Sequence, residues 1–506
     1  MDKHFFLNAD VPGLNFCDVT LKIKQEGSDK VTKISVWLPL HDWNGRFQAT
    51  GGGGFLTGVF ESMLGIAVGQ GYATAATDGG HGYNPIDPSE WLLSKQGTIE
   101  WDNLHDFSTR ALHYMVLVGK AVTKEFYGTP AHHTYWNGCS SGGRQGYALA
   151  QRYPEDFDGI LASAPAMHFP QTQLASYWPQ VVMQVSKTFP SNCEFNHFRQ
   201  EAIRLCDGRD GVEDGIVAEP YTCDFDPFKL VGEVISCDGV QVTISNATAN
   251  VVHRVIDGPR TPRGHSLWYG VAPSTSFTAL AGTREVNGVR VGAPFPIAVA
   301  WIRLFLLQDP KFDVTTIDYE DFAWLFSQGL NDFAWIVGSD ETNLGALRSA
   351  GTKLLSWHGK IDDVLPYAAT VRYRERVESE YGGAAVVDEF FRLFTPEGVA
   401  HCANGPGPVP VDPLGDLVRW VEQGEAPDTI LGRTKVTDGT AGTRNICRYP
   451  LITKYKGVGD PKSPDSWHCV EEPRVFDVSS NYKPRKGWKE LKATTEQQVI
   501  GYDLSQ

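Results

Sequence analysis

Long apolar runs and an excess of basic residues are both absent from this chain of 506 residues. No stretch approaches the roughly 18 consecutive apolar residues that a membrane-spanning helix needs. Lys and Arg number 45 against 60 Asp and Glu, which gives a formal charge of −15, whereas binding of nucleic acid requires clustered Lys and Arg. The composition, 42% apolar and 21% charged, is that of a globular protein. We therefore expect neither a membrane nor a nucleic acid as partner. The chain is expected to act as a monomer or a homodimer.

Paired CxxC motifs are also absent, although the chain has nine cysteines. Their absence argues against a zinc ribbon or a thioredoxin-type redox site. Single cysteines spread over a long chain are typical of structural disulfides, and hence of a secreted protein or another oxidising compartment. The first residues, MDKHFFLNADVPG, lack the positive segment and apolar core of a signal peptide. Two alternatives follow: a mature or trimmed chain, or a cytoplasmic protein.

Strand and helix patterns alternate over the first third of the chain, which predicts a mostly parallel sheet covered by helices on both faces. In the stretch 103–127, apolar residues recur at steps of three and four, as in an amphipathic helix. The expected strands are 34–40, 46–50, 72–78, 133–138 and 158–165, and a second helix is expected at 142–153.

Residues 168–350 break this alternation. They are rich in Pro, Gly, Asp and aromatic residues and hold four of the nine cysteines. The fold class is therefore α/β, with a core domain formed by 1–167 and 351–506 and an inserted domain formed by 168–350; the Lys- and Pro-rich tail from about 435 is expected to wrap the core. The alternation resumes with strands at 353–359 and 390–394 and helices at 367–380 and 416–424.

The sharpest motif is Gly138-Cys139-Ser140-Ser141-Gly142, which fits G-x-S-x-G and lies between an expected strand and an expected helix. A serine hydroxyl is a weak nucleophile, so it must stand exposed on a tight turn within reach of a base. Glycines permit such a turn, and the N-terminus of the following helix favours developing negative charge. The motif predicts Ser140 as a catalytic nucleophile.

An acid and then a histidine follow the nucleophile along the chain in α/β-hydrolases. The segment SWHGKIDD (356–363) reads as a strand end, a glycine turn and then Asp362 or Asp363. The segment FTPEGVAHC (394–402) places His401 in a loop after a strand. Order and context together predict an α/β-hydrolase fold with a triad of Ser140, one of these two acids, and His401.

Two cysteines flank this predicted triad: Cys139 directly precedes Ser140, and Cys402 directly follows His401. A disulfide holds its two Cα atoms about 5.5 Å apart, so a Cys139–Cys402 bridge would bring the Ser140 and His401 side chains within bonding range. On the loop-entropy model, closing so long a ring stabilises the fold by roughly 3–5 kcal/mol.

A glycine run suits the same chemistry. Gly51 to Gly54 follow an expected strand upstream of the serine, where a backbone N–H can face an oxyanion. We expect Gly53 or Gly54 to form an oxyanion hole together with the N–H of Ser141.

These motifs resemble those of the tannase and feruloyl esterase family, which carries Cys-Ser, Asp and His-Cys with the two cysteines bridged. The resemblance implies an α/β-hydrolase fold with a large inserted lid, and Asp362 rather than Asp363 as the acid. The matching segments cover nearly the whole chain: WNGRF (43–47), GGGGF (51–55), ATDGGHG (76–82), GCSSGGRQG (138–146), HGKIDDVLP (358–366), GVAHCANGPG (398–407) and CRYP (447–450).

The segment CDGRDGVEDGI (206–216) is a second motif, in which aspartates offer hard oxygen ligands and glycines let carbonyls turn inward, as calcium requires. It is not an EF-hand, because Val212 stands where that loop needs an acid and the terminal Glu is missing. The residues alone leave an acidic turn and a calcium site open. The resemblance implies a structural Ca²⁺ in the lid, bound by the side chains of Asp207, Asp210 and Asp214 and the carbonyls of Val212 and Ile216.

The resemblance also implies two further disulfides, Cys206–Cys223 and Cys447–Cys469. Cys17 matches a family cysteine whose partner is missing here, so either the chain is trimmed or Cys17 is free. Cys237 lacks its usual neighbouring cysteine, and Cys193 as a substitute partner stays open.

The predicted function is that of a serine carboxylesterase, and the resemblance implies aromatic (phenolic) acid esters, such as gallate or hydroxycinnamate esters, as substrates. Two alternatives stay open: hydrolysis of a lactone or polyketide-type ester in a biosynthetic or detoxifying route, and a non-catalytic binding protein on a hydrolase fold. Aromatic residues of the insert suit a flat phenolic group; the candidates are Trp301, Phe305, Trp324, Phe326 and Trp335.

Adjacent His132 and His133 are considered as metal ligands. Neighbours that enter a strand are expected to point to opposite faces, which argues against a shared ion.

Overall fold

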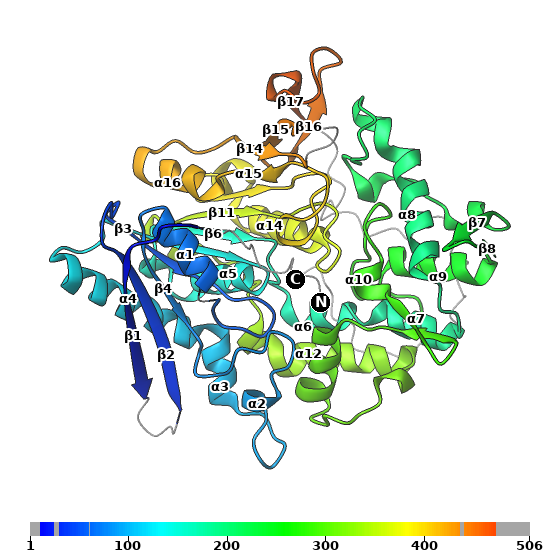
Figure 1. Cartoon of the computed structure of the whole chain (residues 1–506), viewed down its shortest axis with the longest axis horizontal. Coiled ribbons are helices and arrows are strands. Elements are labelled where there is room, and N and C mark those ends of the chain that lie inside the picture. The colour runs from blue at the N-terminus through cyan, green and yellow to red at the C-terminus, as the bar shows by residue number, and fades with distance from the viewer. Residues whose placement is uncertain (1–10, 25–29, 60, 436–439, 472–506) are drawn as a thin grey trace.

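The computed structural model describes residues 11–24, 30–59, 61–435 and 440–471. Its centre is a sheet of eight strands, in which β2 runs antiparallel to its neighbours and the remaining pairs are parallel (Figure 1). In spatial order the strands are β1 (Phe16–Lys24), β2 (Val31–Pro39), β4 (Ala73–Thr77), β3 (Arg46–Thr50), β5 (His133–Cys139), β6 (Gly159–Ser163), β11 (Lys353–Trp357) and β12 (Phe391–Phe394).

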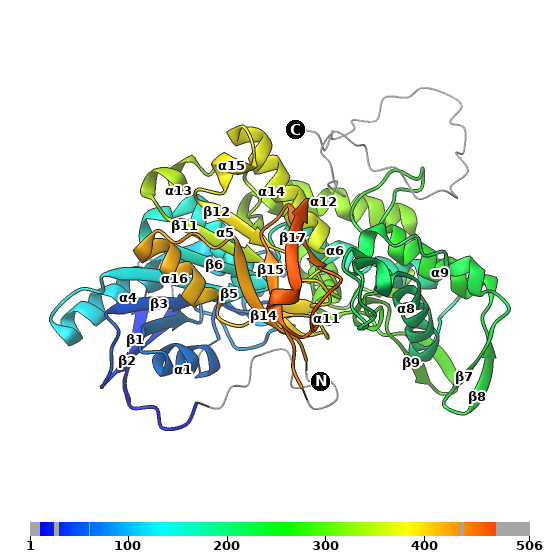
Figure 2. The same cartoon turned by 90° about the horizontal axis from the view of Figure 1, so that it is seen from above.

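Helices cover both faces of this sheet (Figure 2). Trp136 packs in the buried cluster of one face and its neighbour Tyr135 in that of the other, because successive strand side chains point to opposite faces. The first face carries α4 (Ala111–Tyr127), α5 (Ser141–Arg152), α13 (Gly345–Ala350) and α14 (Tyr367–Tyr381), and the second carries α1 (Glu61–Gly69) and α16 (Pro413–Gln423).

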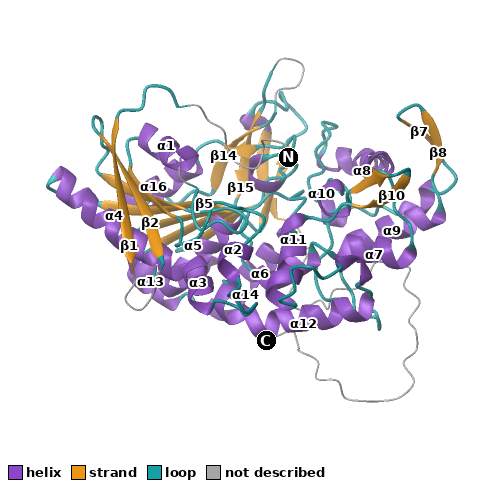
Figure 3. Ribbon diagram, turned by 60° about the horizontal axis from the view of Figure 1, so that its bottom comes forward, coloured by secondary structure: helices purple, strands orange, loops and turns teal. Residues whose placement is uncertain are grey.

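The chain between β6 and β11 forms the insert, which is mostly helix and loop and lies beside the sheet (Figures 1 and 3). Its buried core, which includes Trp301 and Phe305, is continuous with Phe55 and Phe107 of the core domain. The elements are α6 (Phe169–Ala175), α7 (Trp178–Ser186), α8 (Asn192–Cys206), β7 (Val234–Cys237), β8 (Val240–Thr243), α9 (Asn246–Asp257), α10 (Thr278–Ala281), β9 (Thr283–Val286), β10 (Val289–Gly292), α11 (Pro296–Ala300) and α12 (Tyr319–Val337). α13, which the sequence analysis assigns to the insert, packs against α5 of the core.

Small elements complete the described part of the chain. The loop segments before α4 contain α2 (Ser89–Leu92) and α3 (Trp101–His105), and α15 (Ala384–Val387) precedes β12. The C-terminal strands are β13 (Val409–Pro410), β14 (Thr429–Arg433), β15 (Thr443–Cys447), β16 (Leu451–Tyr455) and β17 (Trp467–Glu471). The predicted tail falls in part on 436–439 and 472–506, which lie outside the described residues.

The helix expected at 103–127 is divided in the structure into α3, a π-helical turn (Asp106–Arg110) and α4. The other strands and helices expected from the sequence differ from those of the structure by at most three residues at either end. The sequence analysis missed β1, a strand whose side chains alternate between half-buried and exposed over most of its length. Within the described ranges, no helix combines the length and apolar character needed to cross a bilayer.

Candidate active site

Ser140 lies on the tight turn between β5 and α5, as the motif predicts. Its backbone has φ 63° and ψ −121°, a region that costs a non-glycine residue free energy. The turn is held by hydrogen bonds from Ser140 N–H to Ser163 O (3.0 Å) and from Arg144 N–H to Ser140 O (2.9 Å). A Cβ atom on Gly138 would lie 2.6 Å from the Gly142 backbone, so the motif needs glycine there.

The structure brings Ser140, Asp362 and His401 together. The Ser140 hydroxyl lies 2.9 Å from His401 Nε2, and His401 Nδ1 lies 2.7 Å from Asp362 Oδ2. This arrangement lets the imidazole accept a proton from the serine while the carboxylate orients the ring.

Asp362 is buried and is held by four donors. Oδ1 accepts the N–H groups of Val364 (2.9 Å) and Leu365 (2.7 Å), and Oδ2 accepts His401 and the Nε2–H of His358 (3.1 Å). Burial alone raises the pKa of a carboxyl, but His401 and His358 outweigh it and hold the pKa of Asp362 well below its ordinary value. His358 was not among the residues predicted from the sequence, where its only signal is its position four residues before the acid in HGKID.

Two carboxylates act on the charge of His401. Burial lowers the pKa of its imidazole, but Asp362 and the neighbouring Asp363 outweigh burial, so the pKa lies above the ordinary 6.5. Burial and the charge of Asp362 raise the pKa of Asp363 itself.

A disulfide joins Cys139 to Cys402 across 263 residues, with Cα atoms 6.0 Å apart. Cys402 and the next residue, Ala403, have positive φ values of 48° and 84°. The loop that carries His401 is therefore irregular, and the disulfide ties it to the turn that carries Ser140.

The same loop is tied to the acidic segment of the insert by Arg444. This guanidinium donates to Glu397 Oε1 (2.9 Å), four residues before His401, and to Asp214 Oδ2 (2.8 Å). A Cβ atom on Gly398 would lie 2.8 Å from the Ile216 side chain. The acidic segment thus packs directly against the histidine loop.

A narrow cavity opens beside Ser140 and His401, with a volume of about 20 Å³, enough for one water molecule. Its remaining walls are Gly54, Ser141, Ala166, Gln173, Phe295, Ile297, Val364 and Leu365. The structure therefore corrects the predicted substrate residues. Trp301, Phe305 and Phe326 are core residues of the insert, whereas Trp324 and Trp335 are 54% and 65% exposed, and none of these five lines the cavity.

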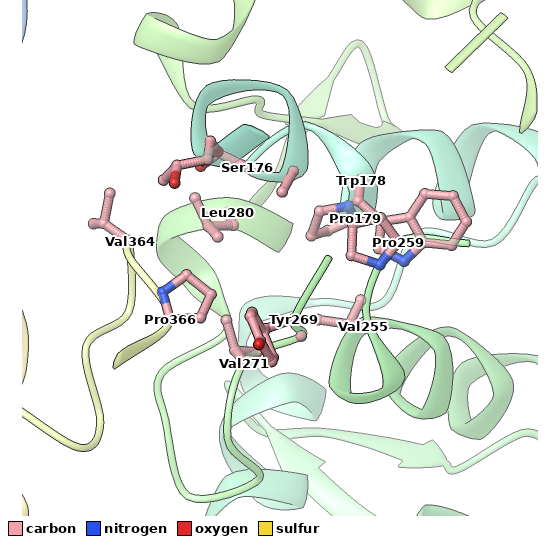
Figure 4. A pocket seen from close by; sticks show the side chains of 13 residues that line it. Ser176, Trp178, Pro179, Val255, Pro259, Tyr269, Val271, Leu280, Val364 and Pro366 are labelled. Carbon is pink, nitrogen blue, oxygen red and sulfur yellow. The ribbon is translucent and has the colours of Figure 1, made fainter. Parts of the chain in front are cut away.

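A second cavity lies between the insert and the segment that follows Asp362 (Figure 4). Its walls are mainly apolar and include Trp178, Tyr269 and Leu280. Val364 lines both cavities, so the two are neighbours.

Two of the three residues predicted for the oxyanion hole lie at the cavity beside Ser140. Gly54 and Ser141 line the catalytic cavity, and the Ser141 hydroxyl donates to Gly54 O (2.7 Å). Gly53 does not line the cavity, and its carbonyl accepts the N–H of Leu56 (3.0 Å). Gly52 N–H is engaged by Gln145 Oε1 (3.0 Å).

The acidic segment folds around the carboxylate of Asp207, which accepts the N–H groups of Asp214 (3.3 Å), Gly215 (2.9 Å) and Ile216 (3.1 Å). Asp210 Oδ1 accepts Val212 N–H (3.0 Å), while its buried Oδ2 has no hydrogen-bond partner among the described residues. Burial raises the pKa of Asp210 to about 6. The unpartnered oxygen of Asp210 is a hard ligand of the kind that calcium takes. The ligand atoms of Asp207, Asp210 and Asp214 do not all lie within 4.8 Å of one another, and Arg444 already pairs with Asp214.

The remaining cysteines form three more disulfides: Cys193–Cys237, Cys206–Cys223 and Cys447–Cys469. Cys17 is unpaired. Cys193 is thus the partner of Cys237, which the sequence analysis left open.

The structure contradicts the expectation that His132 and His133 point apart, because their Nδ1 atoms lie 2.7 Å from each other. His132 precedes β5, so the alternation of a strand does not apply to it. With Glu422 they form the one group of three metal-ligand side chains within 4.8 Å that the described ranges contain. Arg46 makes two hydrogen bonds of 2.6 Å to Glu422 and lowers its pKa to about 2. This guanidinium neutralises the carboxylate and opposes a cation there.

Comparison with known proteins gives one consistent result. A family model described as "Tannase and feruloyl esterase" matches residues 17–470. A "Probable feruloyl esterase" of Arthroderma benhamiae is 46% identical over 464 residues, which are 91% of this chain and 86% of that protein. Among solved structures, a tannin acyl hydrolase from Aspergillus niger is 26% identical with a TM-score of 0.84, covering 91% and 87% of the two chains. Feruloyl esterase B from Aspergillus oryzae is 28% identical with a TM-score of 0.79, covering 90% of each chain.

The disulfide beside the triad gives a first prediction. Replacing Cys139 and Cys402 together by Ala should lower the free energy of unfolding by about 3–5 kcal/mol and slow the labelling of Ser140 by a fluorophosphonate at least tenfold, because His401 is no longer held beside it. Denaturant unfolding and labelling rates measure the two effects.

The matched control is the Cys447→Ala, Cys469→Ala variant, which opens a disulfide away from the cavity. It should lose about 3 kcal/mol on the same model and label at the wild-type rate. Equal labelling of both double variants would show that the Cys139–Cys402 disulfide does not position the histidine.

Proposed function

This chain belongs to the tannase and feruloyl esterase family, and we propose that it is a serine carboxylesterase that hydrolyses esters of phenolic acids through an acyl-enzyme. The observation that carries the proposal is the continuous hydrogen-bonded line from Ser140 Oγ through His401 to the buried Asp362. The names of the relatives, feruloyl esterase and tannin acyl hydrolase, both denote esters of phenolic acids and support this acyl class.

The first half of the reaction forms the acyl-enzyme. Ser140 Oγ attacks the ester carbonyl carbon, and His401 Nε2 takes the hydroxyl proton. Asp362 orients the ring through Nδ1 and stabilises the imidazolium that forms. The oxyanion is held by the N–H of Ser141, at the start of α5, and by the N–H of Gly53 or Gly54. Gly54 lines the cavity, which supports Gly54 as the second donor. His401 then gives its proton to the departing alcohol.

The second half releases the acid. His401, neutral again, takes a proton from water, and the water oxygen attacks the acyl carbon. The same N–H groups hold the second oxyanion, and Ser140 recovers its proton from His401. The second histidine that donates to Asp362, His358, keeps the carboxylate in place through both halves.

The walls of the cavity suit an aromatic acyl group. Phe295 and Ile297 approach from the insert, and Val364 and Leu365 from the segment after the acid. Such apolar walls would cover both faces of a flat ring once the cavity, which has room for about one water molecule in this structure, has widened to admit it. With four disulfides the chain fits an oxidising compartment, and secretion is the proposed location.

Calcium belongs to the proposal as a structural ion in the insert. Asp207, Asp210 and Asp214, with the carbonyls of Val212 and Ile216, are the groups that would hold it. The ion would supply charge to a segment rich in carboxylates. The buried, unpartnered Asp210 Oδ2 supports this assignment.

An ester panel with a Ser140→Ala control tests the function. Wild-type protein should hydrolyse methyl ferulate, methyl caffeate or methyl gallate, and Ser140→Ala should lower kcat by a factor on the order of 10⁴ to 10⁶, because the nucleophile is lost. Hydrolysis that survives in Ser140→Ala would exclude this mechanism. Turnover confined to a short aliphatic ester would contradict the phenolic acyl class.

The pH profile tests the charge of His401. Only the neutral ring accepts the serine proton, and its pKa is raised, so kcat/KM should rise with pH to a midpoint above pH 6.5. Asp362→Asn should move this midpoint to lower pH and lower kcat by roughly 10⁴. Asp363→Asn is the control: it removes a nearby charge and should move the midpoint downward while kcat falls by less than about tenfold. A wild-type midpoint below 6.5 would contradict the effect of the carboxylates.

Calcium binding is tested on protein dialysed against EGTA. Titration should show binding of Ca²⁺, and a calcium concentration 100 times Kd should stabilise the fold by about 2.7 kcal/mol. Asp210→Asn should weaken binding, whereas Glu213→Gln removes the same charge from the same segment without touching the proposed ligand set and should bind nearly as wild type. An equal loss of Ca²⁺ affinity in the two variants would mean that only the net charge of the segment attracts the ion.

A further inference from the structure

Gln173 is the polar side chain that the insert contributes to the cavity beside Ser140. The other insert residues in that wall, Phe295 and Ile297, are apolar. Ser140 and His401 are engaged with each other, and the Ser141 hydroxyl donates to Gly54 O. Among the described lining residues, the amide of Gln173 is therefore the side-chain group left to recognise a polar substituent.

The amide is buried and lacks a partner on its oxygen. Gln173 is 5% exposed, and its Oε1 has no hydrogen-bond partner in the described part of the chain. A buried carbonyl oxygen without a donor is costly. A bound group that donates a hydrogen bond removes that cost, so the site selects for such a group.

The helix that carries Gln173 directs it to the catalytic cavity. Thr172 and Ala175 of α6, and Ser176 directly after it, line the second cavity, whereas Gln173 lines the first. Positions 172, 175 and 176 share one side of a helix, and position 173 lies off that side. α6 also packs along α12 in the buried core of the insert, which holds the amide in place.

We propose that Gln173 determines specificity by accepting a hydrogen bond from a phenolic hydroxyl on the acyl ring. This inference rests on the proposed function and names the residue that recognises the hydroxyl group of the acyl ring. A neutral amide suits a neutral hydroxyl, which donates to the oxygen. A ring that carries a carboxylate in that place offers no donor to this oxygen.

The test compares methyl 4-hydroxycinnamate with methyl cinnamate, which differ only in the ring hydroxyl. Wild-type protein should prefer the hydroxylated ester in kcat/KM. Gln173→Leu should lower that preference by at least about tenfold, because the acceptor is lost, with most of the loss on the hydroxylated ester. Gln173→Glu keeps an acceptor and should restore most of the preference over Gln173→Leu.

Gln180 provides a matched control. It is also a buried glutamine whose Oε1 lacks a partner among the described residues, but its Nε2 donates to Leu280 O (2.9 Å) and Gly282 O (3.2 Å), and it does not line the cavity. Gln180→Leu should lower stability and leave the preference between the two esters unchanged.

A second measurement covers variants with weak activity. In the Ser140→Ala background, calorimetry gives Kd for both intact esters, and adding Gln173→Leu should weaken binding of the hydroxylated ester alone. An unchanged preference in Gln173→Leu, with the wild type active on both esters, overturns this inference and leaves the proposed function standing. A wild type that is labelled at Ser140 but hydrolyses no aromatic ester overturns the acyl class itself.

Discussion

The disulfide between Cys139 and Cys402 sets the distance on which the rest of the site depends. Ser140 stands in a strained backbone conformation, and His401 lies in a loop that contains two left-handed residues. Ser140 lies between β5 and α5, and His401 begins a short 3-10 turn whose next residue departs from helical geometry. Along the chain, 261 residues separate the two side chains. Bringing two segments so far apart in sequence together costs chain entropy. The disulfide between their immediate neighbours lowers that cost, because it keeps the two segments close even in the unfolded chain. The 2.9 Å separation of the Ser140 hydroxyl and the His401 imidazole follows from that link and from the hydrogen bond that orients the imidazole toward Asp362.

Asp362 shows how the fold supports a buried charge. A lone carboxylate in this place would become neutral, because burial disfavours the charged form. Two backbone N–H groups and two histidines donate to it instead. The same contacts lower the pKa of the acid and raise that of His401, so one carboxylate both orients the base and sets the pH at which the base is neutral.

The insert does more than cover the serine. It contributes Phe295, Ile297 and Gln173 to the cavity wall, and its acidic segment contacts the histidine loop through Ile216 and Arg444. A structural ion in that segment would therefore act on the loop that carries the catalytic base. The buried core of the insert continues into Phe55 and Phe107 of the core domain, which anchors the insert beside the site.

The sequence by itself determined the parallel sheet, the nucleophile turn, the order of the triad and the bridge beside it, because each depends on local spacing and on neighbours along the chain. The choice between Asp362 and Asp363 came from family resemblance, and in the structure Asp362 accepts the imidazole. Only the tertiary structure decided which side chains face the cavity. Trp301 and Phe305 look like pocket residues in sequence but fill the core of the insert. Gln173 carries no local signal, and His358 is marked only by its position four residues before the acid. The contact between His132 and His133 and the disulfide between Cys193 and Cys237 likewise became clear only from the tertiary structure. Periodicity along a chain reports secondary structure, but the facing of a side chain toward a cavity depends on contacts between segments far apart in sequence.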